Sequence, residues 1–560
     1  MRILLRTRGP HQLDQCQLLA KYGKHDPVRP HVAWDSFGWY GHVLDVPNLT
    51  APLVKQIIAS HNQFLSAHTI QAYSIPPFQE HDSAILGPGD LDSTMAAIGM
   101  TKGPHSDPAF DGGAGSGVIV AWGHLDSGID ETHSGEFCFN DGPAAGISNP
   151  AILRVKGKLD LFQGAYPLNP HGTWTAEIVG RSADKNGNWL GGAYRAHIYD
   201  ARVLDPEGSG DSITVGDGFN YLLKQPIDAI NVSLGGPGND PIMIAALEAC
   251  WAAGIVVCVA AGNSGNWPPQ CNATPGNCAC DGSVGSPADA NDAMSFAAST
   301  AGVPNPADPG GLDPLGIYVQ TWSSRGPRHA DGSPLPFYLT GPGFAITPGP
   351  TDPVNSGTSF SAPHGTASIL ALIHKLKRTT PGLTKQQIAY TVRQTLFATG
   401  VKLGYDKDPA KYTAAQAYCI QGNGLIAVDV AYSQIGGSTP PPPPPPSNRL
   451  GLPSQTQVGY VTVKGTQAPN PPPHSGAEAT QLDVFLDKQT YNAGDTVTAA
   501  LGLVFTKDGA PLSGRQVKVM FAGLSSMVNT DQNGSGIATF IAPTVAQDTQ
   551  EAYQAVFQGD

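Results

Sequence analysis

The chain has 560 residues, of which 40% are hydrophobic and only 14% are charged, and its formal net charge is −13. This composition supports a sizeable hydrophobic core and excludes a wholly disordered chain. A nucleic-acid binder is not expected, because the chain lacks the basic field that displaces counterions from phosphate. No apolar run approaches the roughly 20 residues that a helix needs to cross a bilayer, so we expect no membrane insertion.

Residues 1–75 combine strand and helix patterns. The patterns predict strands at Ile3–Arg6, His42–Val46 and Thr69–Tyr73, and helices at Leu13–Tyr22 and Ala51–Ala59. Together these elements predict a small α+β domain of ferredoxin-like type. The chain starts with only one short apolar stretch, Ile3–Leu5, which does not suffice for the apolar part of a secretory signal peptide.

The middle of the chain has the pattern of an α/β domain. Residues 76–115 lack sustained periodicity and are interpreted as a connecting segment. From 116 to 435, apolar runs such as GVIVAW, DAINVSLGG and IVVCVAAGN alternate with helix patterns, which is typical of buried parallel strands. One of these helices is expected to begin at Pro241 and to stop at Gly254. We therefore predict a parallel sheet flanked by helices, with functional residues directly after its strands.

The C-terminal part is separated by proline. Pro440–Pro446 and Pro469–Pro473 mark residues 436–479 as a semi-rigid linker, since proline runs adopt extended polyproline II. Residues 480–560 then alternate apolar and polar side chains between turn signals such as Asn492–Asp495. Short strands with regular turns predict a β-sandwich.

Three residues have the chemistry of a serine-hydrolase triad. Asp126 follows a strand expected at Val118–Ala121, whereas His171 and Ser359 each begin an expected helix. A serine hydroxyl needs a base to become a nucleophile at neutral pH, and that base needs a partner that fixes its tautomer. Because the three residues are far apart in sequence, only the tertiary fold can bring them together.

Four segments around these positions resemble the subtilisin-like serine peptidase family. They are DSG at 126–128, HGT at 171–173, AAGNSG at 260–265 and GTSFSAPH at 357–364. Their order, Asp, His, Ser, is also the order in this family, and the resemblance covers about residues 116–435. It implies a serine endopeptidase that cleaves polypeptides through an acyl-enzyme intermediate. Trp174 and Glu177 depart from the family's common histidine motif.

The resemblance also implies a role for each matched residue. Ser359 would attack the scissile carbonyl, His171 would transfer the proton, and Asp126 would orient His171. The side-chain amide of Asn263 would stabilise the oxyanion. The residues that would bind an extended peptide substrate are Ser233, Leu234, Gly235, Ala260, Ala261 and Gly262.

Resemblance to known families also implies roles for the two flanking domains. Ahead of a peptidase of this family, residues 1–75 would be an inhibitory prodomain. The segments YNAGDTV, DGAPLSGRQVKV and TDQNGSGIATF, within about residues 480–545, resemble bacterial Ig-like repeats of the invasin type. This second resemblance implies an Ig-like domain, and the proline linker ahead of it predicts a detachable targeting module, with a structural lid or a dimerisation domain as the alternatives.

No cofactor is expected for the chemistry, and the sequence offers no secure metal site. The segment at 183–188 presents Asp184, Asn186 and Asn188 as oxygen ligands for Ca²⁺, but an ordinary polar turn is the favoured alternative.

The cysteines fall into two groups. Cys271, Cys278 and Cys280 favour a disulfide or free thiols over a zinc site, because no His or fourth Cys stands at ligand spacing beside them. Cys250 and Cys258 lie in apolar segments and are interpreted as ordinary buried thiols.

Two other functions stay open at this point. One is a binding or adhesion protein with an inactive peptidase fold, and the other is an esterase, which shares the acyl chemistry. The segment Gly357–Ser361 does not follow the G-x-S-x-G pattern of esterases. Composition and family favour a location outside the cell, and the chain is expected to be a monomer.

Overall fold

The computed structural model describes residues 1–47, 49–75, 79–80, 89–110, 112–113, 117–131, 154–163, 168–182, 187–265, 282–300, 317–328, 334–403, 405 and 412–436, and six strands between 480 and 557. Contacts within the chain divide it into two units, residues 1–453 and 454–560. Several predicted features lie outside the described residues, namely the linker from 437 to 479, Cys271, Cys278 and Cys280, and the calcium-ligand candidates Asp184 and Asn186.

The N-terminal domain is an antiparallel sheet with helices. Its elements are β1 (Arg2–Thr7), α1 (Leu13–Leu19), β2 (Lys24–His25), β3 (His31–Trp34), β4 (Trp39–Asp45), α2 (Ala51–Ala59) and β5 (Phe64–Thr69). The strand order is β2-β4-β1-β5, and β3 also pairs with β4. Alternate residues of β1, Ile3 and Leu5, pack with Leu44, Ile57 and Phe64 in a small core.

The single strand expected at Thr69–Tyr73 is wrong. β5 ends at Thr69, and a separate strand, β6 (Ala72–Ser74), follows it. β6 pairs antiparallel with β12 (Ser209–Asp211), which belongs to the next domain. Its conformation therefore depends on a long-range contact that the local sequence pattern does not contain.

The second domain is built on a seven-stranded parallel sheet, which confirms the predicted α/β fold. In spatial order its strands are β10 (Val155–Asp160), β11 (His197–Arg202), β9 (Ala121–Asp126), β13 (Ala229–Val232), β14 (Val256–Ala260), β15 (Ala293–Ser299) and β16 (Tyr338–Pro342). The strand expected at Val118–Ala121 is wrong, because β9 begins only at Ala121 and ends at Asp126. The pattern of apolar residues did not reveal the bounds of this strand, because β9 contains the buried polar side chains of His124 and Asp126.

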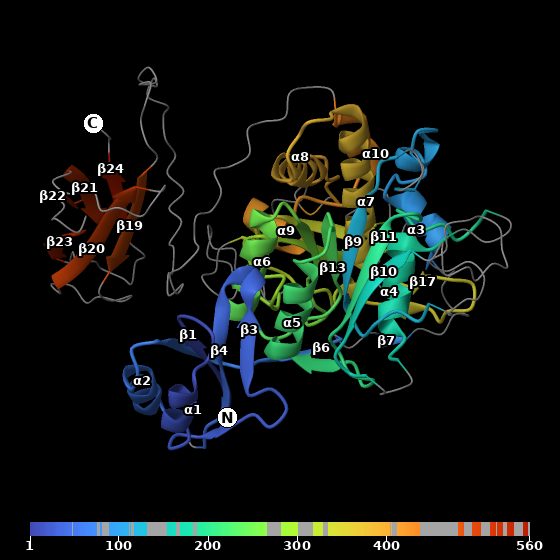
Figure 1. Cartoon of the computed structure of the whole chain (residues 1–560). Coiled ribbons are helices and arrows are strands. Elements are labelled where there is room, and N and C mark those ends of the chain that lie inside the picture. The colour runs from blue at the N-terminus through green and yellow to red at the C-terminus, as the bar shows by residue number, and fades with distance from the viewer. Residues whose placement is uncertain are drawn as a thin grey trace. The chain divides into compact units, whose positions relative to one another are not determined.

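Helices cover both faces of this sheet (Figure 1). Among the described residues they are α3 (Leu91–Ala97), α4 (His171–Gly180), α5 (Ser212–Leu222), α6 (Pro241–Ala252), α7 (Thr358–Thr379), α8 (Lys385–Ala398), α9 (Ala414–Gln421) and α10 (Val428–Gln434). The neighbours Ala229 and Ile230 point to opposite faces, as in any strand. Ile230 joins the core under α5 and α6, whereas Ala229 joins the core under α4 and α7.

No helix in the described part of the chain is long and apolar enough to cross a membrane. Cys250 and Cys258 are buried free thiols, as predicted, and burial raises the pKa of Cys258 to about 12. Cys419 is disulfide-bonded.

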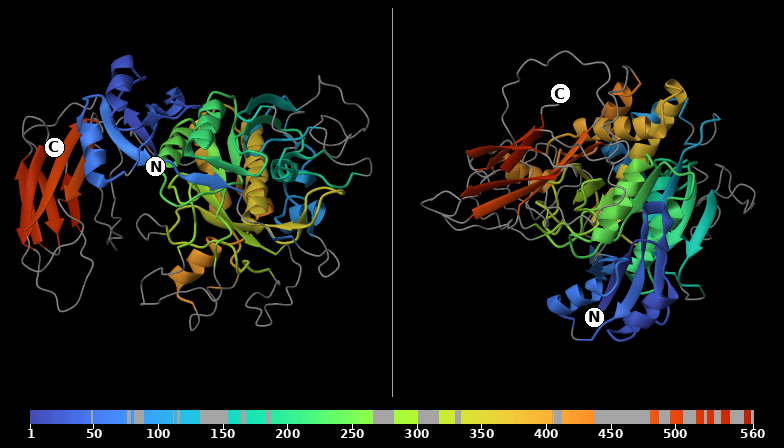
Figure 2. Two further views of the ribbon diagram at one scale, coloured as in Figure 1. Left: turned by 90° about the horizontal axis from the view of Figure 1, so that it is seen from below. Right: turned by 60° about the vertical axis from the view of Figure 1, so that its left-hand side comes forward.

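The N-terminal domain packs against α5 of the second domain (Figure 2). Trp34 is buried in the core that α5 shares, and its indole N–H donates to Asp217 Oδ1 at 2.8 Å. Ser36 donates its backbone N–H to Asn220 Oδ1 at 3.2 Å and its hydroxyl to the Asn220 carbonyl at 3.1 Å. Apolar burial and directed hydrogen bonds thus fix the two domains against each other.

The C-terminal unit contains two three-stranded antiparallel sheets among its described residues. The first consists of β19 (Thr480–Leu486), β20 (Thr496–Phe505) and β23 (Ser535–Ile541), and the second of β22 (Leu524–Asn529), β21 (Gln516–Phe521) and β24 (Tyr553–Phe557). The Ig-like assignment stays a prediction.

Candidate active site

Asp126 and His171 form a buried pair at the carboxyl edge of the sheet. Asp126 is the last residue of β9, and His171 is the first residue of α4. His171 Nδ1 lies 2.9 Å from Asp126 Oδ1, and neither side chain is exposed. The fold therefore brings together two of the predicted site residues that are 45 positions apart.

The surroundings of Asp126 keep its carboxylate charged. The Ser127 N–H donates to Asp126 Oδ1 at 2.7 Å, and the Thr175 hydroxyl donates to Oδ2 at 3.4 Å. Burial alone would raise the pKa of Asp126, but attraction to His171 and the hydrogen bonds from His171 and Ser127 outweigh it and hold the pKa below its usual value. A charged carboxylate at this place fixes the tautomer of His171 and stabilises its cation.

Ser359 lies in the first turn of α7, which packs against α4. The ring centroids of His171 and Phe360 are 6.1 Å apart, so His171 lies beside this turn. Ser359 Oγ donates to the Ser233 carbonyl at 3.2 Å, and Ser233 Oγ donates to the Ser359 carbonyl at 2.8 Å. Backbone N–H groups at a helix N-terminus favour developing negative charge, which suits a nucleophile at this position.

Asn263 follows β14 and is oriented by Thr358. Asn263 Oδ1 accepts a hydrogen bond from the Thr358 N–H at 2.9 Å and another from the Thr358 hydroxyl at 3.0 Å. A Cβ atom at Gly357 would lie 3.1 Å from Asn263 Nδ2, so a larger residue there would crowd the amide. The side-chain amide is thus held next to the start of α7, where Ser359 lies.

Ser233, Leu234 and Gly235, the residues expected to pair with a peptide, directly follow β13. Leu234 is completely buried. The backbones of Gly235 and Ser74 exchange two hydrogen bonds of 3.0 Å each. Because β6 also pairs with β12, residues 72–74 lie as the middle strand between β12 and Gly235.

The tail, meaning β6 and the described residues that follow it, also binds the second domain at other points. The Ile75 N–H donates to the Gly208 carbonyl at 2.9 Å. A little further along the chain, β7 (Gln79–Glu80) pairs antiparallel with β18 (Asn355–Ser356), just ahead of Ser359 in sequence. The tail therefore binds two segments that border Ser359, one near Ser233 and the other at β18.

Ala260, Ala261 and Gly262 lie at the end of β14, where small residues are required. Both alanines are buried. Gly262 has a φ of +107°, and a Cβ atom there would lie 2.8 Å from Ser324 Oγ. The Gly262 N–H donates to Thr358 Oγ1 at 3.0 Å, which links this segment to the Asn263 site.

The two departures in the histidine motif are absorbed by α4. Trp174 packs into the core under α4 and α7. Glu177 forms a buried ion pair with Arg181, one helical turn later. Neither residue replaces a group of the Asp126–His171 pair.

Several residues of the site were not predicted from the sequence. Thr358 and Thr175 act through hydrogen bonds that only the fold reveals, although Thr358 stands beside the nucleophile candidate. Asp200, on β11, lies opposite His124 of β9, and its Oδ2 accepts from the Ile129 N–H at 3.1 Å. Burial, reinforced by the nearby Asp126, raises the pKa of Asp200 to about 7.

Comparison with known proteins places the chain in a family. The subtilase family (Peptidase_S8) model matches residues 115–424, which is more than half of the chain. The chain is similar to the serine protease AprX of Bacillus subtilis (strain 168), 36% identical over 115 residues, which are 18% of this chain and 26% of AprX. It is similar to subtilisin DY of Bacillus licheniformis, 32% identical over 153 residues, which are 27% of this chain and 49% of that protein.

A longer alignment extends to subtilisin E of Bacillus subtilis (strain 168), 27% identical over 328 residues, which are 58% of this chain and 71% of that protein. The first two alignments thus span about a quarter and about half of the relatives' length. Since the family match includes β9, α4 and α7 with their polar residues, the chain belongs to the subtilase family.

Proposed function

We propose that the chain is a serine endopeptidase, with Ser359 as nucleophile, His171 as general base and Asp126 as its partner. The observation that carries this proposal is the 2.9 Å contact between His171 Nδ1 and Asp126 Oδ1, beside the first turn of α7. The similarity to AprX, a serine protease by name, supports the same activity.

The chemistry follows from the positions of these groups. His171 takes the Ser359 proton as Oγ attacks the scissile carbonyl, and Asp126 stabilises the resulting imidazolium. His171 then gives the proton to the leaving amine. In the second half of the reaction, His171 takes a proton from the water that attacks the acyl-enzyme and returns this proton to Ser359 Oγ. Asn263 Nδ2 and the Ser359 N–H are assigned to the oxyanion. These steps need no cofactor.

The substrate is proposed to be an extended polypeptide. β6 supports this proposal, because it lies as an added strand between β12 and Gly235. Peptide backbone from another protein would use the same hydrogen-bonding groups of Gly235 and Gly208. Ala260, Ala261 and Gly262 are assigned to the pocket for the residue before the scissile bond, where small side chains leave room for a large partner.

Residues 1–75 are proposed to be an inhibitory prodomain. The strand β6 occupies the edge that substrate needs, and Trp34 anchors the domain in the core next to α5. Substrate then competes with a segment of the same chain, whose effective concentration is high.

For the rest of the chain, we propose the domain boundaries that the sequence predicts. Residues 76–115 connect the prodomain to a catalytic domain at 116–435, and residues 436–479 link it to a C-terminal domain at 480–560. That domain is proposed to be an Ig-like targeting module, and the protein to be a monomer that acts outside the cell without nucleic-acid partners.

A fluorophosphonate probe tests the activity and excludes the main alternative. Once residues 1–75 have left the cleft, the probe should modify Ser359, as identified by peptide mapping. An inactive adhesion protein would not react at Ser359. Comparison of casein with a short-chain nitrophenyl ester then separates an endopeptidase, which cleaves both, from an esterase, which cleaves only the ester.

A further inference from the structure

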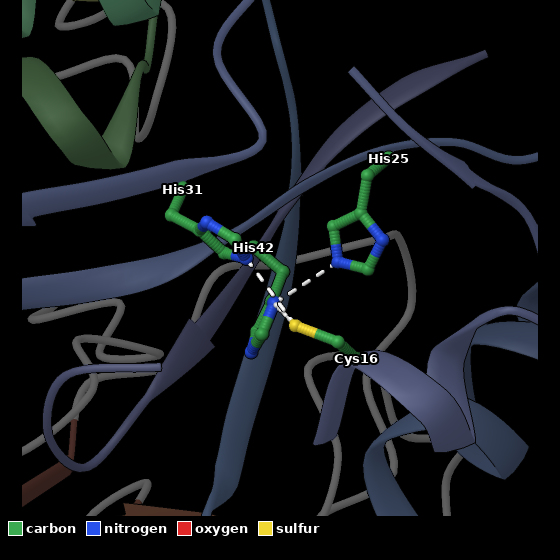
Figure 3. Close-up of side chains that lie close together, drawn as sticks. All are labelled: Cys16, His25, His31 and His42. Atoms are coloured by element: carbon green, nitrogen blue, oxygen red, sulfur yellow. Dashed lines mark hydrogen bonds between the residues drawn. The ribbon is translucent and has the colours of Figure 1, made fainter. Parts of the chain in front are cut away.

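A group of metal-binding side chains lies in the N-terminal domain, away from the residues assigned to catalysis. It consists of Cys16, His25, His31 and His42. One ligand atom from each residue lies within 4.8 Å of those of the other three. Figure 3 shows the thiol and the three imidazoles directed toward one another. The four residues are spread over positions 16–42 without a familiar ligand spacing, which is why the sequence did not reveal them.

The antiparallel sheet explains why the imidazoles converge. β2 and β3 both pair with β4. His31 stands directly opposite His42, so their side chains share one face of the sheet. His25 stands opposite Leu44, which is two residues from His42 and therefore on that same face. Cys16, from α1, reaches this face and approaches both His31 and His42.

Three of the separations between ligand atoms are close to those of a tetrahedral zinc site. Cys16 Sγ lies 3.4 Å from His31 Nε2 and 3.9 Å from His42 Nδ1, and His25 Nε2 lies 3.1 Å from His42 Nδ1. With Zn–S of about 2.3 Å and Zn–N of about 2.05 Å, tetrahedral angles place S and N about 3.6 Å apart and two N atoms about 3.3 Å apart. These three separations lie within a few tenths of an ångström of the tetrahedral values, whereas the widest pair of ligand atoms, up to 4.8 Å apart, would have to close by about 1 Å around the ion.

We propose that Cys16, His25, His31 and His42 bind one zinc ion in a closed, structural site. One thiolate and three imidazoles form a donor set that suits zinc and disfavours Mg²⁺ and Ca²⁺, which prefer oxygen ligands. Four protein ligands leave no open position for water or substrate, so the ion stabilises the domain and does not take part in hydrolysis.

Neighbouring groups prepare the ligands for this role. His42 is completely buried, and its Nε2 lies 3.0 Å from Oε1 of the buried Gln15. Oε1 can only accept, so Nε2 carries the proton and the lone pair of Nδ1 faces the cluster. His11 stacks on His31 with centroids 3.7 Å apart, which restricts the orientation of that ring.

The proposed ion has a structural task in this domain. The hydrophobic core of its sheet is small and consists of Ile3, Leu5, Leu19, Leu44, Val46, Ile57 and Phe64. Small domains with limited cores commonly gain stability from a metal or a disulfide. Zinc would tie α1 to β2, β3 and β4, and its binding free energy would add to the stability of the domain.

Metal content tests the proposal without reference to activity. The full chain would carry Ser359→Ala, so that self-cleavage cannot remove the N-terminal domain. After dialysis against metal-free buffer, we expect one equivalent of zinc per chain. Replacement by Co²⁺ should give the intense visible bands of a tetrahedral site and a thiolate-to-cobalt charge-transfer band. A chain without stoichiometric zinc, or a cobalt spectrum without the thiolate band, would overturn the proposal.

Variants assign the ligands. Cys16→Ala and His31→Ala should each abolish stoichiometric zinc binding and the zinc-dependent rise in melting temperature. His61→Ala is the matched control, because His61 belongs to the same domain but stands outside the cluster. Removing the partner of a ligand, in Gln15→Ala, should weaken zinc binding about 10–100-fold. Zinc binding by folded Cys16→Ala with parental affinity would contradict the assignment, and if the variants do not fold, the cobalt spectrum of the parent decides.

Discussion

The backbones of Ser74 and Gly235 exchange two hydrogen bonds of 3.0 Å, one in each direction. This is the pairing that an antiparallel strand makes at its hydrogen-bonded positions. It joins the end of the N-terminal domain to the edge that follows β13, close to Ser233 and therefore to Ser359. Under the proposed function, an incoming peptide would need the same groups of Gly235, and the Ser74–Gly235 pair would then compete with substrate for this edge.

A separate fragment of residues 1–80 should inhibit the processed enzyme at micromolar concentration. Ser74→Pro removes the N–H that binds Gly235, and this loss should raise the inhibition constant about tenfold. Ser74→Ala keeps the N–H and removes only an exposed hydroxyl, so it should inhibit like the parent fragment. Equal inhibition by the proline and alanine fragments, or none by the parent fragment, would contradict the proposed role of β6.

Asn263 should matter for turnover more than for binding. Asn263→Ala removes the amide that Thr358 orients, and kcat should fall about 10²–10³-fold, as after loss of an oxyanion donor. KM on a peptide substrate should change little, because the interaction forms mainly in the transition state. Steady-state kinetics on a chromogenic peptide measure both constants. A loss confined to KM would show that Asn263 binds substrate instead.

Asp200 should make stability depend on pH. Its pKa is about 7 in the fold, against an ordinary value of 3.8, so the folded protein binds more protons between these values. The contribution of Asp200 to the free energy of unfolding therefore decreases as the pH rises from about 4 to 7. Asp200→Asn cannot ionise, so it avoids this loss of stability. The difference in free energy of unfolding between this variant and the parent should therefore be on the order of 1–4 kcal/mol larger at pH 8 than at pH 4.

Urea unfolding in the Ser359→Ala background measures this difference without self-digestion. The stability gain of Asp200→Asn should be larger at pH 8 than at pH 4. Identical differences at the two pH values would exclude the titration of Asp200 in this range.

The C-terminal unit should be dispensable for the chemistry. The residues assigned to catalysis all precede Ile435, so a chain that ends there should retain kcat/KM on a short soluble peptide within about threefold, or about 0.7 kcal/mol. Binding to an insoluble substrate should decrease instead. If the shortened protein is folded but has lost most of its activity on the short peptide, the C-terminal unit supports the cleft directly.

The sequence predicted those parts of the fold that depend on local pattern. The buried run before Asn263 is β14, and α6 begins at the expected Pro241 and ends at Ala252, close to the expected stop at Gly254. The predicted strand ahead of Asp126 was misplaced, because polar residues of the site interrupt its apolar pattern. β6 was misread because its partner, β12, is more than 100 residues away.

Motifs in the sequence revealed the residues proposed for catalysis but not the proposed metal ligands. Asp126, His171 and Ser359 stand in short segments with a family pattern, and the structure gives Asp126 and His171 a direct contact. Cys16 and His42 have no such segment, because a cross-strand register and a helix bring them together. Contacts of this kind depend on the complete fold and leave no local trace in the sequence.

Hydrolysis by Ser359→Ala tests the central claim most directly. Both this variant and the parent would be freed from residues 1–75 by an added protease, so that neither depends on self-cleavage. Ser361→Ala is the matched control in the same turn of α7, since the Ser361 hydroxyl binds the Gly341 carbonyl at 2.9 Å. We predict that Ser359→Ala lowers kcat on a peptide substrate on the order of 10⁶-fold, while Ser361→Ala retains activity. Near-parental hydrolysis by folded Ser359→Ala would contradict the assignment of Ser359 as the nucleophile.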